Sequence, residues 1–406
     1  MDQKQLLSKE WFSMKKEGTV VFPSQKEIGK KIVAALKEKT IVTLCAPPQW
    51  GKTGVSLFVS YHMCMSLKKK KIIDYRNVFF ITGMSDKTWV DQTTERVLPC
   101  WRKNVFHRNT LHRLKTKITE MKEKNEDRNI LLLVDECHIA NKKEHLMSEI
   151  MDSLGKKQLR KRNIKIVQIS ATPSNALIDA DEWSSRHQMI CPEINLKDGY
   201  VSFKTFLLED RIHSLYELSC IHQCGLFMNH MKKFSSPKYH FVRAVSKGKT
   251  GYIIYGKIEV NLRTLCNENH FSFIEMNGET PKNCIQDIYN SLSLQPERHT
   301  LILIKDMLGA AKTIDDSYLG CIHESTPSTK DYSSEVQGLP GRLCGWGKQK
   351  GKESPLLFCD QGIIEQYIEF YESGFDYRDE YLEWKDGRMK ITLDGKITSS
   401  KSYIHK

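Results

Sequence analysis

The residues best suited to chemistry in this chain are a lysine and a threonine that follow a glycine near position 50. They close the run Ala46-Pro47-Pro48-Gln49-Trp50-Gly51-Lys52-Thr53, which has a small residue, four variable residues and then Gly-Lys-Thr. This spacing is typical of a loop that wraps phosphate groups. Gly51 lets the backbone approach a phosphate, Lys52 neutralises phosphate charge, and Thr53 offers a hydroxyl to Mg²⁺. Alanine replaces the usual glycine at the first position and can still make the tight turn.

A phosphate loop that hydrolyses nucleotide needs carboxylates nearby, and Asp135 and Glu136 are the candidates. The two carboxylates follow the apolar run Leu131–Val134, which reads as a buried strand. Ligands of parallel sheets gather at the carboxyl ends of the strands. We therefore expect Asp135 to hold Mg²⁺ and Glu136 to orient and deprotonate an attacking water. Loop and pair together predict binding of ATP or GTP; the alternative is an unimportant strand–turn–helix.

A second Gly-Lys-Thr sequence, at residues 248–250, tests how specific the first one is. Its small-residue position is occupied by Arg243, and no long helix is expected after it. The sequence therefore predicts one phosphate loop rather than two.

The elements that must position these residues alternate between strand-like and helix-like runs, which predicts an α/β fold with mostly parallel sheets and helices on both faces. Two such domains are expected: an ATP-binding domain at residues 1–195 and a second domain at 241–375. A joint is expected at 196–240 and a polar tail at 376–406. Strands of the second half are expected at Gly251–Lys257, Phe271–Gly278, His299–Met307, Tyr318–Ser325 and Pro355–Asp360, and helices at Lys282–Leu294, near Glu335–Cys344 and at Gly362–Gly374.

The composition of the chain indicates what kind of partner it binds and in which compartment it is expected. The net charge of +13 and the pI near 9.0 suit a polyanion such as nucleic acid, although lysine-rich helix faces would give the same balance. The 12 cysteines include no CxxC pair, which favours reduced thiols in the cytoplasm or nucleus. No run is long enough to span a membrane and no secretory segment opens the chain, so we expect an intracellular protein.

One local cluster contains metal-ligating residue types: Cys220, His222, Cys224 and His230. The C-x3-C spacing fits no common zinc pattern, and a helix face carrying polar residues is the plainer interpretation. Whether these cysteines bind metal stays open.

Three further stretches carry a resemblance. Asp135-Glu136-Cys137-His138 is a DExH sequence, Ser170-Ala171-Thr172 ends the next expected strand, and Gln337, Gly341 and Arg342 lie near the end of the chain. In this order they resemble superfamily 2 helicases and translocases of the DExD/H kind, over roughly Phe22 to Asp360. The stretches "ITGMSDKTWVDQ" and "VQGLPGRLCGWGK" look like the corresponding sequences of helicases from large DNA viruses.

The resemblance implies two RecA-like domains of the P-loop NTPase class, with ATP in the cleft between them. Arg342 would be the arginine finger of the second domain, and Gln25 would read the adenine. Coupling between ATP and nucleic acid would involve His138, Ser170, Thr172 and Gln337. Contacts to the sugar-phosphate backbone would involve Thr82, Gly83, Lys305, Lys312 and Thr313.

The chain departs from the family three residues after Arg342. The usual second arginine is replaced by Gly345, and the next basic residue is Lys348. Either Arg342 suffices, Lys348 substitutes, or hydrolysis is slow.

The leading hypothesis is an ATP-dependent helicase or translocase that moves on DNA or RNA with ATP and Mg²⁺. The alternatives are a catalytically weak, ATP-gated nucleic-acid-binding scaffold on the same fold, and a P-loop enzyme without nucleic acid, such as a small-molecule kinase. The sequence leaves open DNA versus RNA and unwinding versus translocation.

Overall fold

The computed structural model describes residues 2–16, 21–65, 73–84, 87–124, 126, 128–137, 150–152, 154–155, 158–173, 186–195, 199–244, 248–305, 314–324, 336–348, 351 and 353–375. Two compact units account for the chain. The first comprises Met1–Pro47 and Gly51–Glu193, and the second comprises Pro48–Trp50 and Ile194–Lys406.

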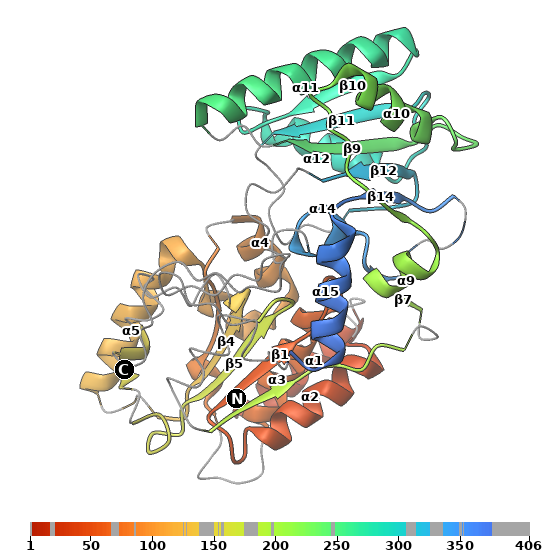
Figure 1. The fold of residues 1–406 in the computed structure, drawn as a ribbon. Helices are drawn as coiled ribbons and strands as arrows, with labels where there is room; N and C mark the ends of the chain where they lie inside the picture. Colours follow the sequence, from red (N-terminus) through yellow and green to blue (C-terminus); the bar gives the residue numbers. More distant parts are fainter. Residues whose placement is uncertain are drawn as a thin grey trace, which may run out of the picture. The chain divides into compact units, whose positions relative to one another are not determined.

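The first unit is an α/β unit. Its elements are α1 Gln3–Lys16, α2 Pro23–Ala35, β1 Ile41–Cys45, α3 Lys52–Cys64, η2 Tyr75–Asn77, β2 Val78–Thr82, α4 Lys87–Arg96, η3 Pro99–Asn104, β3 Val105–Phe106, η4 Arg108–Thr110, α5 Leu111–Glu123, β4 Leu131–Asp135, β5 Lys165–Ser170 and β6 His187–Ile190. The six strands form one sheet in the order β3-β2-β4-β5-β1-β6, and every pairing is parallel (Figure 1).

Burial explains why these strands have no polar face. All five residues of β1 and all five of β2 are buried, so side chains on both faces of the sheet are covered. The helix α5 contributes Leu114 and Ile118 to a cluster that also contains Phe79 and Leu132 from the strands. The sheet is therefore a rigid frame whose strand ends can hold a site.

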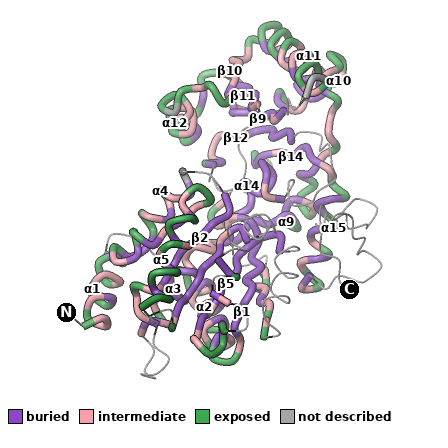
Figure 2. The backbone as a smooth tube through the Cα atoms, turned by 90° about the vertical axis from the view of Figure 1, so that its left-hand side faces the viewer, coloured by how far each residue is buried: buried purple, intermediate pink, exposed green. Residues whose placement is uncertain are grey.

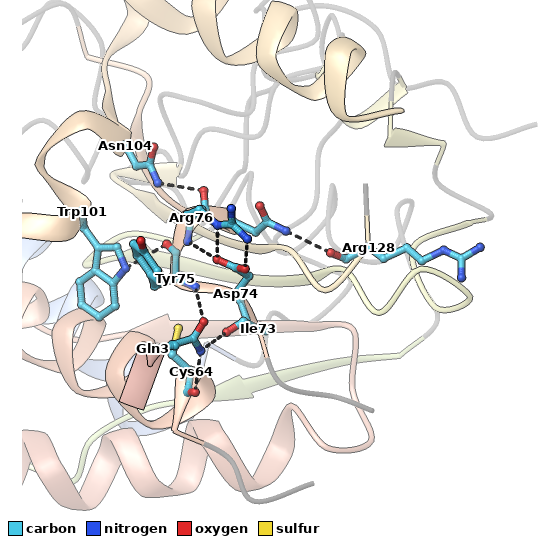
Figure 3. A network of polar contacts seen from close by, with 10 residues as sticks. Gln3, Cys64, Ile73, Asp74, Tyr75, Arg76, Trp101, Asn104 and Arg128 are labelled. Carbon is cyan, nitrogen blue, oxygen red and sulfur yellow. Dashed lines mark hydrogen bonds and ion pairs between the residues drawn. The ribbon is translucent and has the colours of Figure 1, made fainter. Parts of the chain in front are cut away.

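A polar network fixes the N-terminal helix α1 to the rest of the first unit (Figure 3). The Gln3 side chain donates to the carbonyls of Cys64 and Ile73 and accepts from the N–H of Tyr75. The carbonyl of Tyr75 in turn accepts from the buried indole of Trp101 at 3.1 Å. The segment that leads into β2 is thus tied from two sides.

The second unit repeats the architecture. Its elements are β7 Tyr200–Val201, α9 Phe203–Leu208, β8 Ile212–His213, α10 Ile221–Met231, β9 Tyr239–Ala244, α11 Gly248–Glu268, β10 Ser272–Met276, α12 Lys282–Ser291, β11 Thr300–Lys305, β12 Leu319–His323, α14 Leu339–Arg342, β13 Gly345–Trp346, β14 Leu356–Phe358 and α15 Gln361–Glu372. Six strands form a parallel sheet in the order β10-β11-β9-β12-β14-β8, and β13 pairs with β7 in a separate antiparallel ribbon.

The predicted fold class is confirmed. Both units carry a mostly parallel sheet with helices, as expected for two RecA-like domains, and buried residues follow the strands while exposed ones lie on the helices (Figure 2). Within the described ranges, no helix has the length and apolar character that crossing a membrane would need.

Two expectations for the second half differ from the structure. The stretch Gly251–Lys257, expected as a strand, lies inside α11. Its run of tyrosines and isoleucines has high β propensity, but the buried Tyr255, Leu262 and Cys266 recur at helical spacing. A long helix therefore does follow the second Gly-Lys-Thr sequence, contrary to the expectation.

The segment expected as a joint, residues 196–240, contains regular elements in the structure. Its described part contains β7, α9, β8 and α10, all in the second unit, and β8 is the edge strand of the second sheet. A strand of two residues has too little length to produce a recognisable pattern. The expected tail at 376–406 lies outside the described residues.

Candidate nucleotide site and second-unit candidate residues

The expected phosphate loop has the geometry of a strand–loop–helix turn. It leaves β1 at Cys45 and enters α3 at Lys52. Gly51 precedes the helix with φ of +101°, in the left-handed region that favours glycine. The N–H of Ala46 donates to the carbonyl of Ser170 at 3.1 Å, which ties the start of the loop to the end of β5. The start of the loop therefore lies at the neighbouring carboxyl ends of β1 and β5, and α3 begins where the loop ends.

The acidic pair lies beside this turn. Asp135 ends β4, which is separated from β1 by β5 alone. The Nζ of Lys52 lies 3.9 Å from Oε1 of Glu136, and both side chains are largely buried. Glu136 has φ of +48°, a conformation that costs free energy in any residue with a Cβ and that clusters at functional sites. The structure thus brings together Lys52, Asp135 and Glu136, which the sequence predicted to act together.

Asp135 is held by two donors. The indole Nε1 of Trp89 donates to its Oδ2 at 2.9 Å, and the N–H of Glu136 donates to its Oδ1 at 3.1 Å. Burial, and secondly the charge of Glu136, raise the pKa of Asp135 above its ordinary value, while Lys52 and Trp89 oppose the shift. A divalent cation here would favour the charged carboxylate.

Sequence reasoning did not assign a role to Trp89. The residue lies in α4, far from Asp135 along the chain, and no spacing rule links a tryptophan to a strand-terminal aspartate. The only available signal was its place a few residues after Thr82-Gly83 at the end of β2.

Gln25 lies beside the loop. Its Oε1 accepts from the N–H of Phe22 at 3.0 Å, and the residue is buried. A Cβ added at Gly51 or at Gly54 would overlap the Gln25 amide. The glutamine therefore packs directly on the turn that holds Lys52, and its contact to adenine stays a prediction.

Three of the four variable residues of the loop, Pro48 to Trp50, group with the second unit. There the hydroxyl of Tyr200 donates to the carbonyl of Pro48 at 2.5 Å, and Nε1 of Trp346 donates to the carbonyl of Trp50 at 3.0 Å. The two rings belong to the β7–β13 ribbon and contact each other edge to face. Gln49, between the two carbonyls, has φ of +58°. These two donors were not predicted from the sequence.

The coupling and backbone-contact candidates of the first unit lie at strand ends. Oγ of Ser170 accepts from the N–H of Thr172 at 3.0 Å, so the two expected partners share one turn. Oγ1 of Thr82 accepts from the N–H of Met84 at 3.3 Å, and Thr82 and Gly83 are both buried. Their roles in coupling and in nucleic-acid contact stay predictions.

Arg342 ends the short helix α14 of the second unit, and a buried carboxylate sets the start of that helix. Oε2 of Glu324 accepts from the N–H of Leu339, the first residue of α14, at 3.0 Å. The same carboxylate lies 3.2 and 3.3 Å from Nη1 of Arg243 on β9. Glu324 thus links β9, β12 and α14. The sequence interpretation missed Glu324 and left Gln337 and Arg342 as candidates, which they remain.

Lys348, the candidate to replace the missing second arginine, is engaged within the second unit. Its buried Nζ donates to the carbonyl of Ile314 at 2.6 Å and lies 3.5 Å from Oδ1 of Asp316. The departure at Gly345 has a backbone cause, because φ of +140° strains any residue with a side chain.

The remaining candidates divide into two groups. Lys305 ends β11 and is described, whereas His138, Lys312 and Thr313 lie outside the described residues. The Cys220–His230 cluster forms the start and body of α10, as the helical interpretation expected.

Comparisons with known proteins concern the architecture. No protein-family model and no curated protein matches the chain. Among solved structures, the chain is similar to S. cerevisiae Dbp5 bound to RNA and ADP BeF3, with 13% identity, 83% of each chain covered and a TM-score of 0.43. It is also similar to the Escherichia coli DEAH/RHA helicase HrpB, with 13% identity and a TM-score of 0.49. That match covers 84% of this chain and 43% of the HrpB chain, so this chain spans less than half of HrpB.

Proposed function

We propose that the chain is a nucleic-acid-dependent ATPase of the helicase or translocase kind, which binds ATP with Mg²⁺ at the carboxyl edge of the first sheet. The observation that carries the proposal is the approach of Lys52 to Glu136 beside Asp135, at the left-handed turn of Gly51. A lysine, two carboxylates and the N-terminus of a helix are what phosphoryl transfer needs, because catalysis there consists of positioning and charge stabilisation.

Each side chain has a separate task. Lys52 and the N–H groups of α3 bind the phosphates, whose charge competes with Glu136 for the lysine. Glu136 then accepts the proton of the attacking water. The hydroxyl of Thr53 and the carboxylate of Asp135 are oxygen donors of the type that Mg²⁺ prefers, and they would hold the ion. When bound, the ion neutralises charge that develops on the phosphate oxygens.

The second unit would supply Arg342 to the γ-phosphate and a surface for nucleic acid. Arginine suits this task because its guanidinium stays charged and can meet two phosphate oxygens at once. The overall charge of +13 is consistent with a polyanionic partner. The likeness of two stretches to helicases of large DNA viruses, and the choice between DNA and RNA, stay predictions.

The test is ATP hydrolysis by the purified protein alone and with single-stranded DNA, RNA or duplex. We expect at least one polymer to stimulate turnover. Glu136→Gln should keep nucleotide binding and lose turnover, since the amide cannot accept the proton. Equal, low turnover by the wild type and Glu136→Gln with every polymer would overturn the proposed catalysis and favour the ATP-gated scaffold.

A further inference from the structure

Two cysteines lie side by side where the first sheet leads into the expected phosphate loop. Cys45 is the last residue of β1, and the loop begins at the next residue, Ala46. Cys191 follows β6, the edge strand that pairs with β1. The last register pair of these two parallel strands is Leu44 with Ile190. The next position along both strands therefore sets Cys45 opposite Cys191.

Both thiols point to the same face of the sheet and are close enough to join. Oγ1 of Thr43 on β1 lies 2.9 Å from Nε2 of His187 on β6. Side chains alternate between faces along a strand, so Cys45 shares the face of Thr43 and Cys191 that of His187. Neighbouring strands lie about 4.8 Å apart, and a disulfide joins Cα atoms about 4.4–6.8 Å apart. The two thiols already lie within hydrogen-bonding reach of each other.

The two thiols differ in access and in acidity. Cys191 is half-buried, whereas Cys45 is fully buried. The contact with Cys45 lowers the pKa of Cys191, and burial only partly opposes this shift. Burial, and secondly the contact with Cys191, raise the pKa of Cys45 well above its ordinary value. Cys191 is therefore the thiolate that meets a reagent first, and Cys45 is the thiol that reacts second.

Cys45 is also tied to the groups that surround the phosphate loop. Its Sγ donates to the carbonyl of Ala171 at 3.8 Å, and the charge of Lys52 lowers the pKa of the thiol against the effect of burial. On the side away from β6, its register partner is Ser170 of β5, whose carbonyl accepts the first N–H of the loop. A bond to Cys191 would remove the thiol proton and draw the end of β1 toward β6, so the start of the loop would shift away from β5.

We propose that Cys45 and Cys191 form a redox modification site, which closes to a disulfide on exchange with a low-molecular-weight disulfide and thereby weakens nucleotide binding. The Cys191 thiolate attacks one sulfur of the reagent, forms a mixed disulfide and releases a thiolate. That thiolate takes the proton of Cys45, whose sulfur then attacks Sγ of Cys191 and displaces the second thiolate. Two protein thiols are thus oxidised, and one reagent disulfide is reduced to two thiols.

The site is consistent with the reduced state expected for the other cysteines. Where thiols are kept reduced, the disulfides that form are transient and serve catalysis or redox sensing. A pair beside the phosphate loop would make nucleotide binding depend on the thiol poise. The effect on binding rests on the proposed function, whereas formation of the disulfide does not.

The first measurement asks whether the disulfide forms. Reduced, purified protein is incubated with oxidised glutathione, free thiols are blocked, and the peptides are mapped by mass spectrometry. We expect a linked Cys45–Cys191 peptide that dithiothreitol removes. Cys45→Ala should stop at the mixed disulfide, with one glutathione on Cys191, and Cys191→Ser should leave Cys45 as a free thiol. Cys284→Ser, at an exposed cysteine of α12, should form the linked peptide as the wild type does.

The second measurement is binding of a fluorescent ATP analogue by the same samples. Oxidation should weaken binding by the wild type and by Cys284→Ser about 10-fold, as the loss of one hydrogen bond to a charged phosphate would. Binding by Cys191→Ser should not change, and dithiothreitol should restore the wild type.

Three outcomes would contradict these expectations. Recovery of both wild-type cysteines as free thiols, or of Cys191 only as its glutathione adduct, would overturn the proposal. A linked protein that binds the analogue as tightly as the reduced one would overturn it as well. A reduced wild type that binds no nucleotide would overturn the proposed function and with it the effect on binding, while the peptide map would decide the disulfide separately.

Discussion

The two units build the same local structure around a Gly-Lys-Thr sequence and give it different surroundings. In both, an interior strand of the parallel sheet is followed by a helix that begins at this sequence, β1 by α3 in the first unit and β9 by α11 in the second. Five residues separate the strand from the glycine in the first unit, and three in the second.

The neighbouring strand ends explain the difference in chemistry. Beside α3 lie Asp135 and Glu136, with Glu136 close to Lys52. In the second sheet, Glu324 follows β12 and is engaged by Arg243 and the start of α14, while β11 ends in Lys305. Under the proposed function, a Gly-Lys-Thr sequence would bind nucleotide only where the loop is long enough to surround phosphate and an acidic pair lies beside it.

Replacing the lysine of each Gly-Lys-Thr sequence should give the largest difference between the two units, measured as ATP turnover. Lys52→Ala should lower ATP turnover by about 100-fold or more, because it removes a charge aimed at the transferred phosphate. Lys249→Ala should change turnover without polymer by less than about 2-fold, because Lys249 is not part of the proposed nucleotide site. A steady-state assay of the two purified variants decides the matter, and similar losses in both would make the two turns equivalent.

Replacing Glu324 should lower the free energy of unfolding more than replacing an exposed glutamate of the same unit. Glu324→Ala leaves Arg243 and the N–H of Leu339 without their buried acceptor, and we expect the free energy of unfolding to fall by about 3 kcal/mol. Glu259→Ala removes a helix-surface pair with Arg263 and should cost less than about 0.5 kcal/mol. Urea denaturation measures both, and a small loss at Glu324 would deny it the role of linking β12 to α14.

Features that depend on residues close together in the sequence could be predicted, whereas features that depend on residues far apart in the sequence could not. The strands β1, β2, β4 and β5 were predictable because each is rich in apolar and β-branched residues, whereas the short strands β3 and β6 were not predicted. Asp135 was predictable because it ends such a strand, and Lys52 because it follows the spacing of a phosphate loop. The helix α11 was missed because its first residues carry local β propensity that tertiary packing of Leu262 and Cys266 overrides. Trp89 and Glu324 were missed because their partners are far away in sequence, and only the folded sheet brings them together.

Acid should act on the second unit through His323. Its Nε2 accepts from the N–H of Tyr216, so the ring is neutral, and burial lowers the pKa of His323 to about 4. The carboxylate of Glu217 only partly opposes this shift. A depressed folded pKa means that the contribution to stability is present above the unfolded value near 6.5 and is lost as the pH falls toward 4.

The loss between pH 7 and pH 5 should be about 2 kcal/mol in the free energy of unfolding. Denaturation curves at several pH values measure it, and His323→Gln should flatten the profile because the amide accepts the same hydrogen bond without titrating. An unchanged slope in that variant would assign the acid sensitivity to other histidines, such as the buried His240.

The smallest expected effects on stability come from replacing one glycine in each helix, Gly256 in α11 and Gly54 in α3, because the space around the two glycines differs. Gly256, in the interior of α11, has nothing within 4 Å of an added Cβ, so Gly256→Ala should stabilise the protein by about 0.8 kcal/mol through helix propensity alone. Gly54, in the first turn of α3, faces the Gln25 amide, and Gly54→Ala must displace that side chain. We therefore expect little gain in stability and weaker nucleotide binding from Gly54→Ala. Thermal unfolding with and without nucleotide distinguishes the two, because a glycine retained for close approach affects binding, whereas a glycine in open space affects only the helix.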